Sequence, residues 1–205
     1  MRQFDVITFD CYGTLIDWRS GICGAFVAQG LDGDASLRKY SEIEPIVERE
    51  QYRSYREVLG ETASRIAPGI KANFLADSLP SWKPFPDTNP ALERLRGAGI
   101  RLGILSNVDD DLLAETRKHF TVDFDLLITA RQVRSYKPGH AHFLTARQRI
   151  GDSKWLHAAQ SNLHDIAPAR ALGIANAWIN RHAEKGGLRP TYEFRDLKGL
   201  ADAMT

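Results

Sequence analysis

The chain has 205 residues, with 27 lysines and arginines against 26 aspartates and glutamates, which gives a formal net charge of +1. This length fits one sizeable domain, or a core domain with a small insert. The balanced charge gives no reason to expect nucleic acid or an anionic membrane as a partner. No apolar stretch has the length that a membrane span needs. Cys11 and Cys23 are too few for a disulfide framework and favour a reduced, cytoplasmic setting.

Strand-like and helix-like patterns alternate through most of the chain. The first strand-like run, residues 4–10, is rich in β-branched and aromatic residues and leads into a turn at Gly13. Four more such runs follow residue 84, each after a helical pattern. In chain order we predict a helix over 90–98, a strand over 100–105, a helix over 109–120, a strand over 124–129, a helix over 141–150, a strand over 155–159, a helix over 166–172 and a strand over 175–179. The alternation predicts an α/β fold with a Rossmann-like parallel sheet.

A long segment after the first strand interrupts this alternation. Residues 41–59 and 61–74 show apolar positions at helical spacing, and three prolines close the segment at positions 80, 84 and 86. We therefore expect a helical cap over the carboxyl ends of the strands, where open α/β sheets bind their ligands. The expected domains are a Rossmann-like catalytic core over 1–15 and 85–205 and a helical cap over 16–84.

Several common active-site signatures are absent from the sequence. We find no G-x-x-x-x-G-K-[ST], no G-x-G-x-x-G, no G-x-S-x-G and no H-E-x-x-H. Their absence argues against P-loop NTPases, dinucleotide enzymes, α/β hydrolases and zincins.

Polar residues instead follow the ends of successive predicted strands. They are Asp10 with Thr14, Ser106 with Asn107, Lys137, and Asn162 with Asp165. A carboxylate, a hydroxyl, an amide and an ammonium at one mouth are the groups that nucleophilic catalysis by a carboxylate needs. We expect Asp10 to attack, Lys137 to balance its charge, and Asp165 to orient Lys137 or a water. Ser106 and Asn107 would hold an anionic group of the substrate.

These segments resemble the four motifs of the haloacid dehalogenase superfamily. FDCYGTL at 9–15 resembles the first motif, Ser106-Asn107 the second, Lys137-Pro138 the third, and SNLHD at 161–165 the fourth. The superfamily places a helical cap where this chain has its insert. The resemblance extends over nearly the whole chain and implies a hydrolase with Asp10, Thr14, Lys137 and Asp165 as catalytic residues.

Tyr12 decides which branch of the superfamily the chain resembles. The phosphatases of the superfamily have a second Asp at this position, which protonates the leaving alcohol, and they bind Mg²⁺. A phenol with a reference pKa near ~10 is a poor replacement for that acid. The 2-haloacid dehalogenases share the D-x-Y-G-T pattern of this chain; their halide leaves without a proton, and they need no metal or other cofactor. The resemblance therefore implies displacement of halide by Asp10, an aspartyl ester, and hydrolysis of that ester with help from Asp165.

The chain also departs from the dehalogenase pattern. Gln160 stands where those enzymes have Ser, Phe143 where they have Tyr, and His164 where an aromatic wall is expected. The cap arginine that serves the leaving halide has three candidates, namely Arg49, Arg53 and Arg56. The role of His164 stays open between polarising a water and bonding a backbone carbonyl. His140 and His142, at the start of a helix, are expected on the surface.

The expected function is hydrolytic dehalogenation of a small 2-haloalkanoic acid, with Tyr12, Ser106, Asn107 and Asn162 binding the substrate. Two alternatives stay open: a phosphatase of the same superfamily acting on a small phosphate ester, and a catalytically silent binding protein on the same scaffold. The expected partner is a small carboxylic acid, with no nucleic acid, membrane or metal, and a homodimer is left open.

Overall fold

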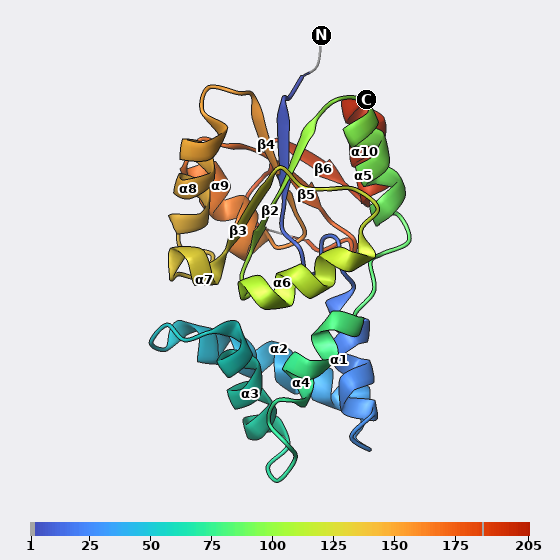
Figure 1. Cartoon of the computed structure of the whole chain (residues 1–205), viewed down its shortest axis with the longest axis vertical. Coiled ribbons are helices and arrows are strands. Elements are labelled where there is room, and N and C mark those ends of the chain that lie inside the picture. Colours follow the sequence, from blue (N-terminus) through green and yellow to red (C-terminus); the bar gives the residue numbers. More distant parts are fainter. Residues whose placement is uncertain (1–2, 186) are drawn as a thin grey trace.

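A six-stranded parallel sheet forms the centre of the computed structural model, which describes residues 3–185 and 187–205. The strand order is β3-β2-β1-β4-β5-β6, and each neighbouring pair runs parallel (Figure 1). The strands are β1 Val6–Phe9, β2 Arg101–Ser106, β3 Leu126–Thr129, β4 Trp155–Ala159, β5 Ala175–Ile179 and β6 Tyr192–Phe194. The chain builds outward from β1 in one direction and then from β4 in the other, so the carboxyl ends of these two strands flank the switch point where such sheets bind ligands. The predicted α/β class with a parallel sheet is confirmed.

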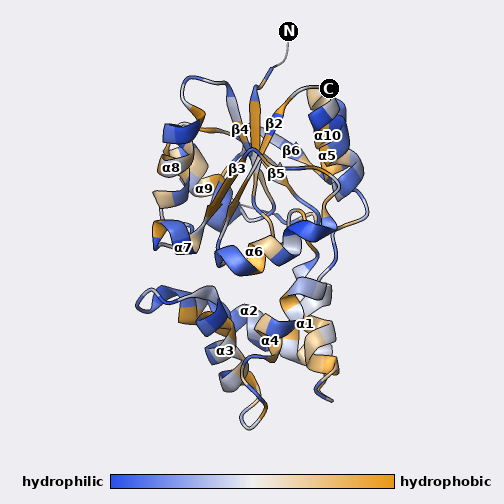
Figure 2. Cartoon of the chain, viewed as in Figure 1, coloured by the Kyte–Doolittle hydropathy of each residue, from blue (hydrophilic) through white to orange (hydrophobic). Residues whose placement is uncertain are grey.

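Helices cover both faces of the sheet. Helices α5 (Thr88–Gly97) and α10 (Leu197–Met204) contact each other on one face, and α8 (Ala141–Ile150) and α9 (Ala167–Ala171) lie on the other (Figure 1). The strands are apolar along most of their length because both of their faces are buried (Figure 2). Successive side chains of β1 serve opposite faces: Val6 packs in a cluster with Phe143 of α8, and Ile7 packs in the larger cluster with Leu92 of α5.

The helical cap predicted after the first strand is confirmed. Its helices are α1 Trp18–Val27, α2 Gly33–Arg49, α3 Tyr55–Ile66 and α4 Phe74–Ser78, and they lie beyond the carboxyl ends of the strands (Figure 1). Aspartates accept hydrogen bonds from the first turns of α1 and α2, at Asp17 and Asp32. Among the described residues, no helix combines the length and the apolar character needed to cross a membrane.

Several details of the helix prediction are wrong. The predicted helix over 41–59 is two helices, because Ser54 and Glu57 form a capping box that starts α3 after a break at Arg49. α2 also begins earlier, at Gly33, and it accommodates Pro45 in its interior. The sequence reading missed α1, α10 and the short edge strand β6, whose periodic patterns are brief and depend on packing for their stability.

Trp82 packs against both α1 of the cap and Tyr12 of the core. Trp82 is almost fully buried and its ring meets Tyr12 of the core edge-on, with centroids 5.9 Å apart. A Cβ atom on Gly21 of α1 would lie 2.3 Å from Cγ of Trp82, so only glycine permits this approach. Gly24, one turn further along the same helix, has no such neighbour within 4 Å.

We expect Gly21→Ala to destabilise the protein by about 1–3 kcal/mol, because the added methyl group overpacks the Trp82 contact. The matched control Gly24→Ala should stabilise it by about 0.5–1 kcal/mol, since alanine is the better helix former and the site is open. Urea unfolding of both variants measures the difference. Equal effects of the two substitutions would contradict the packing argument.

Candidate active site

The carboxyl ends of the strands and the cap enclose a pocket of about 480 Å³. The core contributes Asp10 after β1, Ser106 and Asn107 at the end of β2, Lys137, and the segment 160–165 after β4. The cap contributes aromatic and acidic side chains from α1, α2 and α3. The residues expected at the site from sequence are therefore brought together, because parallel strands present their carboxyl ends at one edge of the sheet.

Lys137 is the centre of the polar network. Its side chain is 1% exposed, and its ammonium donates to Oδ1 of Asp10 at 2.9 Å, to Oδ1 of Asp165 at 2.6 Å and to the carbonyl oxygen of Leu105 at 2.9 Å. All three protons of the ammonium are thus used inside the protein. The lysine is fixed in place and cannot act as a mobile surface charge.

Two buried carboxylates share one ammonium, and the pKa of one is raised while the pKa of the other is lowered. Burial opposes ionisation of Asp165, yet Lys137 and His157 hold the pKa of this carboxyl well below its usual range. Burial raises the pKa of Asp10; Lys137 opposes this shift and the charge of Asp165 adds to it. The two acids likewise raise the pKa of Lys137, against the effect of burial. Asp10 is therefore the more basic carboxylate of the pair, which suits a nucleophile.

The second oxygen of Asp10 is fixed by Thr14. The Thr14 hydroxyl donates to Oδ2 of Asp10 at 2.9 Å and accepts from the backbone N–H of Gln160 at 2.9 Å. Arg181, which is bound to Asp87 through two nitrogens, donates to the carbonyl oxygen of Thr14 at 2.9 Å. Hydrogen bonds thus fix both oxygens of the Asp10 carboxylate.

Asp165 is the last member of a chain of hydrogen bonds that begins at Trp155. The indole N–H of Trp155 donates to the Thr8 hydroxyl at 2.8 Å, and this hydroxyl lies 2.9 Å from Nδ1 of His157. If the hydroxyl donates to Nδ1, His157 carries its proton on Nε2, which lies 3.0 Å from Oδ1 of Asp165. Sequence reasoning missed His157; the available signal was a histidine in the middle of an apolar strand.

The two residues at the end of β2 have different surroundings. Ser106 is fully buried, lines the pocket, and its hydroxyl has no hydrogen-bond partner within the described structure. The amide of Asn107 accepts from the backbone N–H of Lys137 at 2.7 Å and donates to its carbonyl oxygen at 3.1 Å. Asn107 therefore positions Lys137, while the hydroxyl of Ser106 stays without a partner among the described atoms.

Tyr12 and Asn162 line the pocket but are engaged with the protein. The Tyr12 hydroxyl lies 2.7 Å from that of Thr116, and burial raises the pKa of the phenol well above its usual value. The side chain of Asn162 accepts from the backbone N–H of Leu188 at 3.1 Å and donates to its carbonyl oxygen at 3.2 Å. Their role in binding substrate stays a prediction.

The three cap arginines differ in position. Arg53 is paired with Glu50 at 2.6 Å, and Arg56 with Asp111 at 2.7 Å, both at the surface. Arg49 lines a pocket of about 340 Å³ that adjoins the main one and shares Lys137 and His164 with it. Of the three candidates, Arg49 is the one near the site.

The surface position expected for His142 is wrong. His142 is fully buried, and its Nε2 lies 3.1 Å from the carbonyl oxygen of Ser106, to which it donates. Burial lowers the pKa of this imidazole to about 3, so it is neutral at ordinary pH. Phe143 is also fully buried, with its ring edge-on to His157 at 5.1 Å. His142 and Phe143 thus contact Ser106 of β2 and His157 of β4.

Two acidic residues of the cap, Glu44 and Glu48, also line the pocket and were not expected from sequence. They lie on the amphipathic helix α2, where exposed charges are the ordinary finding, so the sequence carried no signal for them. Among the described residues, no group of three or more His, Cys, Asp or Glu side chains is arranged to hold a metal ion.

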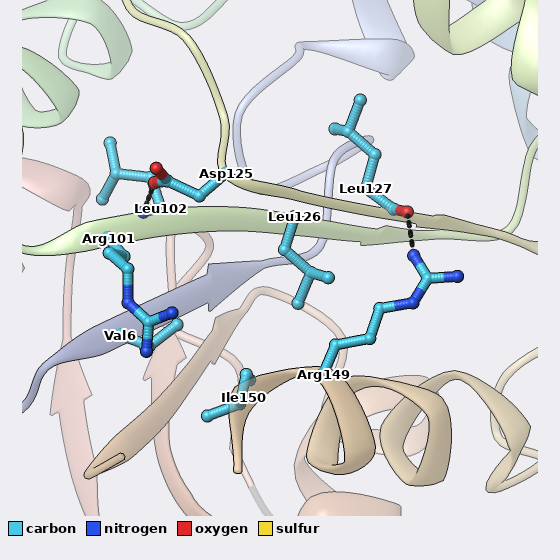
Figure 3. Close-up of a pocket in the computed structure, with 8 residues that line it drawn as sticks. All are labelled: Val6, Arg101, Leu102, Asp125, Leu126, Leu127, Arg149 and Ile150. Carbon is cyan, nitrogen blue, oxygen red and sulfur yellow. Dashed lines mark hydrogen bonds between the residues drawn. The ribbon is translucent and has the colours of Figure 1, made fainter.

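A smaller cavity of about 190 Å³ lies at the opposite, amino-terminal end of the strands (Figure 3). Its lining includes Val6 and Arg101 at the starts of β1 and β2, and Arg149 of α8, which donates to the carbonyl oxygen of Leu127. Asp125 accepts from the backbone N–H of Leu102 at 2.8 Å. Arg149 and Asp125 thus bind neighbouring backbone, and the cavity is separated from Asp10 by the length of the strands.

Proteins of known activity are similar to this chain over most of its length. An (S)-2-haloacid dehalogenase of Pseudomonas putida is 28% identical over 98% of this chain and 98% of that protein. A haloacetate dehalogenase of Moraxella sp. is 28% identical over 89% of this chain and 88% of that protein. The structure of an L-2-haloacid dehalogenase of Xanthobacter autotrophicus with chloropropionic acid covalently bound has a TM-score of 0.85, 17% identity and 97% coverage of each chain, which shows a common fold.

A family model described as haloacid dehalogenase-like hydrolase matches residues 4–172. This range contains β1 to β4, the whole cap, and the group of Asp10, Thr14, Lys137 and Asp165. The chain belongs to the haloacid dehalogenase-like hydrolase family.

Proposed function

We propose that this protein is a hydrolytic dehalogenase of small 2-haloacids that works through an ester on Asp10. The observation that carries the proposal is the arrangement of the Asp10 carboxylate, which is buried at the floor of the pocket with one oxygen on Lys137 and the other on Thr14. The similarity to named haloacid dehalogenases supports the choice of substrate class.

The first step is an in-line displacement. An oxygen of Asp10 forms a bond to C2 of the acid, the carbon–halogen bond breaks, and the halide leaves with the electron pair. A halide needs no proton, so Tyr12, whose raised pKa makes it a weak acid, is not required as a donor. In this proposal the hydroxyl of Ser106, which has no partner among the described atoms, donates to the carboxylate of the substrate.

The second step returns the enzyme to its starting state. Water attacks the carbonyl carbon of the Asp10 ester, which releases the 2-hydroxy acid and one proton. Asp165 is a weak base because its pKa is low, so its part is to hold Lys137 beside the ester. His164 lines the pocket, and burial lowers the pKa of its imidazole, so the neutral form that accepts a proton is present at pH 7.

The alternative of phosphate-ester hydrolysis has less support. That reaction needs an acid to protonate the leaving alkoxide, and Tyr12 occupies the corresponding position with its pKa raised by burial. Release of phosphate from a panel of esters in the presence of Mg²⁺, with no halide release from any 2-haloacid, would favour the alternative.

The covalent step predicts the fate of solvent oxygen. In a single turnover in ¹⁸O-water, with enzyme in excess over a 2-chloroacid, we expect the label in the Asp10 carboxylate and not in the 2-hydroxy acid. Mass spectrometry of the peptide that contains Asp10 measures it. Asp10→Asn should lose activity by on the order of 10³-fold or more. Label in the product of the first turnover would mean direct attack by water.

The raised pKa of Asp10 predicts how kcat/KM falls at low pH. Asp10 must be ionised to attack, and burial together with Asp165 raises its pKa above the ordinary value of 3.8. We therefore expect kcat/KM to fall tenfold per pH unit below an apparent pKa that lies above 3.8, measured by halide release after a check that activity recovers at neutral pH. A profile that stays flat down to pH 4 would contradict the raised pKa.

Loss of the shared ammonium predicts a stability change with a defined pH dependence. Lys137→Met leaves Asp10 and Asp165 buried without a cation, so we expect the free energy of unfolding to fall by about 3–5 kcal/mol at pH 8. The carboxyl pKa values of the folded variant then exceed the unfolded value, so its folded state binds more protons and the loss shrinks as the pH falls towards 5.

The matched control for this measurement is Lys118→Met. Lys118 is 68% exposed and is paired with Glu115 at the surface, so its removal should change stability by less than about 1 kcal/mol at either pH. A Lys137→Met variant that is equally destabilised at both pH values would argue that lost packing, and not charge, causes the effect.

A further inference from the structure

The cap presents two carboxyl groups to the nucleophile's pocket. Glu44 and Glu48 lie four residues apart on α2, hence on one face of the helix, and both are half-buried and line the pocket that contains Asp10. Oε1 of Glu44 accepts from the hydroxyl of Tyr55 at 3.0 Å, and the hydroxyl of Tyr40 lies 3.0 Å from that of Tyr55. Glu44, on the cap side of the pocket, is therefore an acceptor held in place by a phenol.

The pocket as a whole is rich in carboxyl groups. Among the described residues that line it, five carboxyl groups face two permanently basic side chains: Asp10, Glu44, Glu48, Asp165 and Glu184 against Arg19 and Lys137. The near-neutral charge of the whole chain conceals this local excess. A cationic group bound between Glu44 and Glu48 would favour the ionised forms of these two carboxyls.

No cation within the described pocket is committed to the cap carboxyls. Lys137 uses its three protons on Asp10, Asp165 and the backbone, and Arg19 is exposed with its guanidinium over the ring of Trp18. Burial raises the pKa of Glu44 to about 7. Burial and repulsion by Glu44 raise that of Glu48 to about 9, although Lys137 and a hydrogen bond with Asn107 oppose the shift.

A second feature of the same pocket is a buried hydroxyl without a partner. The hydroxyl of Ser106 is fully buried, lines the pocket and has no partner among the described atoms. A buried hydroxyl without a partner costs free energy, and a ligand that accepts from it removes that cost. The pocket therefore offers a donor to an anionic group at the core side and acceptors to a cationic group at the cap side.

We propose that Glu44 and Glu48 recognise an ammonium group of the substrate, so that the pocket takes a 2-haloacid that also carries an amino group. The carboxylate and C2 of this substrate lie beside Ser106 and Asp10, and its ammonium lies between the two cap carboxyls. This inference rests on the proposed function, since the substrate it names reacts at Asp10. It assigns to the cap a choice between zwitterionic and plain haloalkanoic acids.

Binding of unreactive acids tests the recognition apart from the chemistry. Calorimetric titration of the unmodified protein compares a series of ω-aminoalkanoates with alkanoates of equal chain length, neither of which contains a halogen. We expect the best amino acid of the series to bind at least ~10-fold more tightly than its matched alkanoate. Equal or tighter binding of the alkanoates throughout the series would overturn the proposal.

Variants that remove one carboxyl group test whether Glu44 and Glu48 cause the ammonium preference. Glu48→Gln and Glu44→Gln, each made singly, should reduce the ammonium preference to about twofold or less while leaving alkanoate binding unchanged or improved. Glu42→Gln is the matched control, because Glu42 lies exposed on the same helix and does not line this pocket. An unchanged preference in both pocket variants would overturn the assignment, and urea unfolding checks that each variant is folded.

Halide release separates the two proposals. The 2-chloro derivatives of both series are compared for kcat/KM, with the amino compounds expected to be better by the same factor as in binding. Tight ammonium-dependent binding with no halide released from either series would refute the dehalogenase function and leave the recognition intact. Halide release from plain 2-chloroacids together with no ammonium preference in binding would refute the ammonium recognition and leave the dehalogenase function intact.

Discussion

The site depends on one buried ammonium that serves two buried carboxylates. Lys137 reaches Asp10 from one side and Asp165 from the other, and its third proton goes to the backbone of β2. Burying three charges without this contact would be prohibitively costly, so the lysine and both acids are held in one geometry. Burial raises the pKa of Asp10, while Lys137 and His157 hold that of Asp165 low, so Asp10 is the more basic of the two carboxylates.

The parallel sheet makes that contact possible. Asp10 follows β1 and Asp165 follows β4, and these two strands are neighbours in the sheet although some 150 residues separate them in the chain. Lys137 comes from the segment after β3 and crosses to the same edge, where Asn107 holds its backbone from both sides. The order of the strands thus sets the distances between groups that the chemistry needs.

The cap lines the other side of the pocket. Glu44 and Glu48 lie on its side of the pocket that contains Asp10, and Oε1 of Glu44 accepts from the hydroxyl of Tyr55. Arg49, the cap arginine nearest the site, lies in the adjoining pocket. The core therefore supplies Asp10, Lys137 and Asp165, and the cap supplies the opposite wall of the pocket.

The sequence alone determined the α/β class, the inserted helical cap and the residues at the strand ends, because apolar runs and the polar residues after them are local patterns. Asp10, Ser106, Lys137 and Asp165 were found in this way. Tertiary structure decided the rest: that His157 supports Asp165, that Asn107 holds the backbone of Lys137, and that two glutamates of α2 face the pocket. The sequence pattern of an amphipathic helix is the same whether its charged residues face water or a cleft. Only the packing of that helix against the core decides which side is enclosed.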